Sequence, residues 1–99
     1  DIVISNATFD SCIFNNIDFT NITLEDVSLI DVVFNSCDLS NICFDYKMLS
    51  RVVFKNCKMV GVSFIESSLT DIVIDNSKKK VEVGWDAFKN CKSVKWLKD

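Results

Sequence analysis

The sequence of 99 residues contains no histidine, no proline and only two glycines. Without histidine the chain lacks the commonest general base and the commonest metal ligand, so we expect no catalytic residues and no metal site. The five cysteines include no Cys-x-x-Cys pair, the usual spacing of a zinc site. We therefore predict a protein that is not an enzyme and uses no cofactor.

Long apolar runs are also missing, so we expect no membrane association, and no signal peptide is visible. These absences favour a cytoplasmic location. The chain starts at Asp1 rather than at methionine, which favours a fragment of a longer protein. Proline and glycine usually make the turns of β proteins, so any frequent turns must here be made by other residues.

What the sequence has is a period of five. From Ile4 to Ile74 every fifth residue is large and apolar, through fifteen positions without a slip of phase. A second column lies two residues before the first, and thirteen of its fifteen members are apolar, the exceptions being Lys47 and Ser67. Two residues after most of the large positions stands Asn, Asp, Ser or Gly. Neither an α-helix nor a long flat strand has this period.

The two apolar residues of each unit are two positions apart, so both side chains lie on one face of a short strand. Asn and Asp tolerate unusual backbone angles and can make the corner that follows. Four such corners close a coil, and residues twenty apart then stack as parallel strands about 4.8 Å apart. Stacking buries the inward residues that one coil alone leaves exposed. We predict an all-β fold, a four-sided parallel β-helix (solenoid) of nearly four coils over residues 1–76.

The unit Cys37-Asp38-Leu39-Ser40-Asn41 resembles the A-(D/N)-L-x-x consensus of the pentapeptide-repeat family, and similar units fill residues 2–76. This resemblance implies a right-handed, quadrilateral β-helix. The chain is also distantly similar to the bacterial members that protect type II topoisomerases from quinolones. Those members are thought to imitate the phosphate rail of DNA with an acidic rod.

Residues 1–76 hold eleven acids and four bases, a net charge of −7. Residues near one corner form the candidate interaction surface, which consists of Glu25, Asp26, Asp45, Tyr46, Lys47 and Glu66. Lys47 falls at an inward position, where an unpaired ammonium is costly. Either a bulge or a lysine that reaches out to solvent would resolve this conflict. The alternative reading of the acids is a hydrated surface without a partner.

Two further surfaces follow from the register. Asp10, Asp31, Arg51 and Asp71 line the next corner, and a β-branched ladder runs along the following face, through Ile13, Val33, Val53 and Val73. Cys37 and Cys57 share an inward column one coil apart, within reach of a disulfide, although small buried thiols explain them better.

Residues 77–99 lose the period and carry seven lysines against three acids, a net charge of +4. We predict a basic loop followed by a capping segment, in which Trp85, Phe88, Trp96 and Leu97 cover the last coil or join two chains into a homodimer. A helix is one possibility for residues 85–97. The other is a further, register-shifted repeat, because residues 88–94 match residues 54–60 at six of seven positions.

Three functions fit these observations. The first is a scaffold that presents acidic β-helix faces to a protein partner. The second is a DNA-mimicking modulator of a type II topoisomerase that does not itself bind nucleic acid. The third is a structural rod that assembles end to end through its C-terminal cap. Catalysis fits poorly, because the fold fills its interior with apolar side chains and displays polar groups on convex walls.

Overall fold

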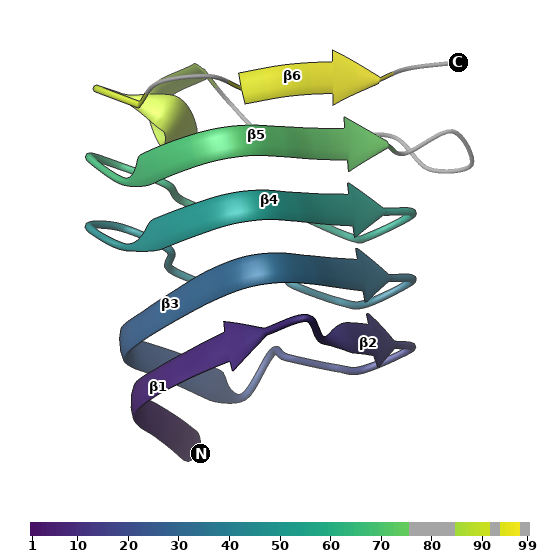
Figure 1. Cartoon of the computed structure of the whole chain (residues 1–99). Helices are drawn as coiled ribbons and strands as arrows, with labels where there is room; N and C mark the ends of the chain where they lie inside the picture. The colour runs from purple at the N-terminus through teal and green to yellow at the C-terminus, as the bar shows by residue number, and fades with distance from the viewer. Residues whose placement is uncertain (76–84, 92–93, 98–99) are drawn as a thin grey trace.

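The computed structural model describes residues 1–75, 85–91 and 94–97, and they form a parallel β-solenoid of about four turns. The strands stack like rungs, from β1 at one end to β6 at the other (Figure 1). The elements are β1 (Ile2–Asp10), β2 (Ile13–Asn15), β3 (Ile22–Asn35), β4 (Met48–Lys55), β5 (Ser68–Asp75), the 3-10 turn η1 (Trp85–Phe88) and β6 (Val94–Leu97). Every strand pairing is parallel, in the order β1-β3-β4-β5-β6, with β2 also on β3.

The strand register confirms the predicted coil of twenty residues. Phe14 lies beside Phe34, Phe34 beside Phe54, and Phe54 beside Ile74. Isolated bridges between Asp18, Asp38 and Lys58 keep the same spacing along another wall. The period therefore continues without a bulge through residue 75.

Both apolar columns point inward and form one core. Its largest fully buried side chains include Phe44, Phe54 and Phe64. The rings of Phe34 and Phe54 are stacked with centroids 5.2 Å apart, and those of Phe44 and Phe64 with centroids 5.1 Å apart. These two ladders meet edge to face, since Phe44 and Phe54 lie 5.9 Å apart at 65°. Such aromatic pairs add stability beyond the area they bury.

The corners use left-handed backbone. Positive φ occurs two residues after the large apolar position, at Asn6, Ser11, Asn16, Asp26, Asp31, Ser36, Asn41, Tyr46, Arg51, Asn56, Gly61, Glu66, Asp71 and Asn90. Most of these are Asn, Asp or Ser, whose short polar side chains allow this conformation. Tyr46, Arg51 and Glu66 adopt it without that advantage, because the stacked neighbours impose the corner.

The thiols of Cys37 and Cys57 act as small hydrogen-bond donors inside the solenoid. The thiols of Cys37 and Cys57 lie 3.2 Å from the carbonyl oxygens of Phe14 and Phe34, each 23 residues earlier. The Ser67 hydroxyl donates in the same way to the carbonyl of Phe44 at 2.5 Å. Cys37 and Cys57 are buried and form no disulfide, which agrees with the interpretation of small buried thiols.

Residues 85–91 and 94–97 stack on the last full coil with a shifted register. Phe88 stacks on Phe64 at 4.9 Å, an offset of 24 residues, and β6 pairs with β5 so that Val94 lies beside Ile72, an offset of 22. Among the described residues of this segment, the only helical turn is the four-residue η1. The described residues of 85–97 contain no α-helix, and their pairing agrees with the repeat alternative. The predicted basic loop, residues 77–80, lies outside the described residues.

Candidate functional site

The corner that follows Leu24 in one coil and Phe44 in the next holds an open depression of about 660 Å³. Strand β3 contributes Glu25 and Asp26, and the turn before β4 contributes the next part of the wall. The lining residues are Leu24, Glu25, Asp26, Val27, Ser28, Asp45, Tyr46, Lys47 and Met48. Five of the six predicted surface residues thus meet here.

Tyr46 connects the sixth residue to the site. Its side chain is 74% exposed, and its hydroxyl donates a hydrogen bond to the Glu66 carboxylate one coil further on. That hydrogen bond and the charge of Glu66 raise the pKa of Tyr46. Glu66 also accepts a hydrogen bond from the Asn90 amide at 3.4 Å. The phenol ring therefore stands on the surface, held at its tip by a carboxylate.

Lys47 avoids the core without disturbing the strand. Its side chain is half-buried, and its Nζ donates to the carbonyl oxygen of Asp45 at 3.4 Å. Met48 still pairs with Ser28 and Ser68 at the normal spacing of twenty. Of the two alternatives for this stretch, the bulge is wrong, and the lysine bends back toward the corner.

The carboxylate of Asp45 is engaged in hydrogen bonds with the neighbouring coil. Its Oδ1 accepts hydrogen bonds from the Ser63 hydroxyl at 2.5 Å and from the Ile65 N–H at 2.8 Å. Partial burial disfavours the charged form of Asp45, but these bonds, with smaller help from Cys43 and Lys47, outweigh it and lower the pKa. The free acids of the depression are therefore Glu25 and Asp26, both exposed.

This lowered pKa predicts a pH dependence of stability. Because the folded pKa of Asp45 lies below the unfolded one, its contribution is complete above the unfolded value, about 3.9, and disappears as the pH falls through the folded value. We expect wild type to lose more stability than Asp45→Asn as the pH falls below about 4. Urea midpoints between pH 7 and pH 3 measure this difference. Parallel curves for the two proteins would contradict it.

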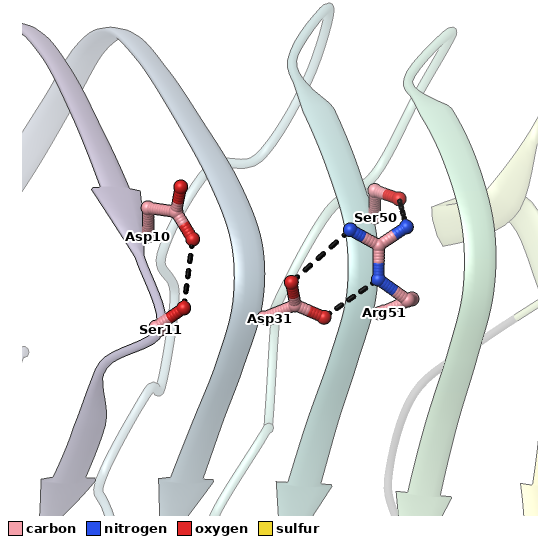
Figure 2. A network of polar contacts seen from close by, with 5 residues as sticks. All are labelled: Asp10, Ser11, Asp31, Ser50 and Arg51. Carbon is pink, nitrogen blue, oxygen red and sulfur yellow. Dashed lines mark hydrogen bonds and ion pairs between the residues drawn. The ribbon is translucent and has the colours of Figure 1, made fainter.

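The neighbouring corner carries charge of both signs. The Arg51 guanidinium donates to both carboxylate oxygens of Asp31, at 2.6 and 3.1 Å, and to the Ser50 hydroxyl at 3.3 Å (Figure 2). Hydrogen bonding from Arg51 lowers the pKa of Asp31. Asp10, on the same wall of the solenoid, accepts a hydrogen bond from Ser11 at 2.9 Å. Paired charges make this corner a weaker binding surface for a cation than the depression.

Comparison with protein families agrees with the geometry. The model of pentapeptide repeats matches residues 4–45, in eight copies. Over residues 4–45 the chain is therefore similar to pentapeptide-repeat proteins. The same strand register and the same corner geometry continue beyond them to Asp75. The comparison with curated proteins found no match.

In the described part of the solenoid, no three Cys, Asp or Glu side chains are placed to hold a metal ion. No helix of the described residues is long and apolar enough to cross a membrane.

The predicted cap is described in part. Phe88 packs against the core and stacks on Phe64, so it extends the stack of Phe44 and Phe64. Trp85 belongs to η1 and Trp96 and Leu97 to β6, and the side chains of these three lie outside the described residues. A role of this segment in dimer formation stays a prediction.

Sequence reasoning missed the apolar part of the depression. Leu24 and Val27 are core residues that also line it, beside Ser28 and the partly exposed Met48. The spacing of twenty could have shown that Ser28 and Met48 are neighbours. It does not show that the side chains between them leave a hollow, because that depends on the way in which Lys47 bends.

Proposed function

We propose that this pentapeptide-repeat solenoid is a non-catalytic scaffold that binds a protein partner through the depression beside Tyr46. The observation that carries the proposal is the convergence of exposed acids, an exposed phenol and apolar wall atoms from successive coils. Elsewhere on the solenoid, in the part that the structure describes, Arg51 neutralises an acid. The free carboxylates of Glu25 and Asp26 favour a partner segment with lysine or arginine side chains.

Tyr46 suits such a partner for a second reason. Exposed aromatic rings attract lysine and arginine through the ring face, which contributes about 0.5–1 kcal/mol at an exposed site. The bond to Glu66 holds the phenol at its tip and limits the freedom that binding would have to remove. Met48, 37% exposed, offers contact to the aliphatic stem of a lysine.

Titration of the isotopically labelled chain with a tetralysine peptide tests the proposal by NMR. We expect amide shifts concentrated in residues 24–28 and 45–48. The double variant Glu25→Gln/Tyr46→Ala should bind roughly fivefold more weakly, which corresponds to about 1 kcal/mol.

Asp10→Asn is the matched control, since it removes one exposed acid at the end of β1, directly before the neighbouring corner, and should leave the affinity unchanged. Shifts spread evenly over all acidic residues would show only general charge attraction and would contradict a specific site.

A DNA-mimicking topoisomerase modulator is the sharper alternative. The acid excess of residues 1–76 supports it. Two local contacts argue against it, since Asp31 is paired with Arg51 and Asp45 is engaged by Ser63 and Ile65, so neither belongs to a free, regular charge rail. A DNA supercoiling assay at micromolar protein separates the two functions, because only the topoisomerase modulator changes the rate.

A further inference from the structure

The stacked strands β3, β4 and β5 (Figure 1) carry a stripe of valines on their outer side. Val33, Val53 and Val73 stand side by side in the register of these strands. The residues before and after each valine are buried in the core, so the valine side chains point outward, and each is only partly buried. All contacts between described elements are contacts of paired strands, so no described element covers the stripe. An uncovered apolar stripe is a candidate contact surface.

Charged residues border this stripe, and their sign changes from one strand to the next. One border is the corner column of Asp31, Arg51 and Asp71, and the other is the column of Asn35, Lys55 and Asp75. Strand β4 therefore carries a cation on each side of the stripe, and β5 carries an anion on each side. Arg51 binds Asp31 within the chain, whereas Lys55, Asp71 and Asp75 form no ion pair with any described residue.

This pattern of charges is complementary to a second copy of itself. Two such walls can meet face to face about a two-fold axis that runs along the strands, between β4 and β5. Each Lys55 then faces Asp75 of the other copy, and the valines meet in the middle. Each Arg51 likewise faces Asp71 of the other copy. A two-fold axis along the stack instead sets the cations of β4 against each other and the anions of β5 against each other. Electrostatics favours the first arrangement, because only that one brings opposite charges together.

We propose that two copies of the chain form a symmetric dimer through the valine wall, which consists of residues 31–35, 51–55 and 71–75. Strand β4 of each copy packs on β5 of the other, with the two walls about 10 Å apart, the usual distance between packed sheets. The wall is narrow, so the dimer is weak, with a dissociation constant of about 0.1–0.5 mM. The corner at Asp31 and Arg51 separates the wall from the depression beside Tyr46, which stays open in both copies.

Sedimentation equilibrium of the whole chain, up to about 1 mM, tests this inference. The average mass should rise from one chain to two and stop there, because a two-fold contact closes on itself. Added salt should weaken the dimer, since charge pairs border the interface. A monomer at every concentration would overturn the inference, and so would a mass that rises beyond two chains.

The variants Lys55→Asp and Asp75→Lys test which residues meet. Each variant alone sets like charges against each other at both ends of the interface, and we expect the dissociation constant to rise about tenfold or more. An equimolar mixture of the two should associate like wild type, because the aspartate of one variant then faces the lysine of the other. A mixture that stays monomeric would overturn the inference. Tighter association of Asp75→Lys alone would overturn it as well, because it indicates an axis along the stack, where position 75 faces Asp71.

Lys58→Asp is the matched control for the charge reversal. Lys58 is exposed and lies beside Asp38 on another wall, so the same change of charge should leave the dissociation constant as in wild type. Circular dichroism checks that each variant is folded. If Lys55→Asp is unfolded, Lys55→Ala replaces it, with an expected rise of about threefold, because alanine removes the ion pair without adding repulsion. An unchanged dissociation constant for the folded variant at Lys55, or an equal effect at Lys58, would overturn the inference.

Discussion

Phe54→Ala should lose about 3–5 kcal/mol of unfolding free energy, the usual cost of removing a fully buried aromatic side chain. Phe54 is completely buried, stacks on Phe34, and meets Phe44 and Phe64 edge to face. No neighbour can close the cavity easily, because each ring is held by the coil above or below it. Domains of this size are stable by about 5–15 kcal/mol, so the loss is a large part of the total.

Phe14→Ala is the matched control for that experiment. Phe14 belongs to the same stack, 5.3 Å from Phe34, but lies in the open first coil and is only partly buried. We expect a clearly smaller loss, and urea unfolding curves with unchanged slope measure both. Equal losses at the two positions would contradict the expectation that the loss follows the burial of the ring.

The period of five predicted most of this fold because every unit meets the same physical requirement. A short strand must bury two side chains, and a corner must follow, so one sequence position decides the placement of the others. The register of Phe34 and Phe54 and the corner at Asn56 follow from counting alone. Asn21 departs from the rule, since it is not among the residues with positive φ. Nothing in the structure explains this exception.

The tail could not be predicted in the same way. Phe88 stacks on Phe64 with an offset of 24 and Val94 pairs with Ile72 with an offset of 22, and neither value follows from a period of five. What the sequence indicated was the similarity of residues 88–94 to residues 54–60. Asn90 does adopt the corner conformation of Asn56, and the Cys91 thiol meets the carbonyl of Phe64 as Cys57 meets that of Phe34.

At the candidate site the repeat period predicts which residues are neighbours but not how their side chains are paired. The register places Glu25, Asp45 and Glu66 close together, but it does not say which carboxylates are free. Asp45 turns toward Ser63 and Ile65, and Glu66 is engaged by Tyr46 and Asn90. These choices depend on side-chain rotamers and on neighbours one coil away. A cluster of acids in the sequence is therefore divided by the structure into residues that stabilise the fold and residues that remain available.

Ser67 shows how an apparent defect in the repeat has a structural purpose. It is 4% exposed, at a position that is apolar in most other units. Its hydroxyl donates to the carbonyl of Phe44, as the thiols of Cys37 and Cys57 do for Phe14 and Phe34. Serine and cysteine therefore answer the same need, a small buried donor beside a corner carbonyl.

Ser67→Ala should accordingly cost about 1–3 kcal/mol, because it leaves the carbonyl of Phe44 buried without this donor. Ser67→Cys should stay within about 1 kcal/mol of wild type, since the thiol keeps a donor of similar shape. Urea unfolding of the three proteins under reducing conditions measures both effects. The comparison isolates the hydrogen bond, because alanine and cysteine both remove the hydroxyl and only cysteine retains a donor. If the alanine variant were as stable as the cysteine variant, the small side chain alone would explain the position, and the donor role of the buried cysteines would have to be abandoned.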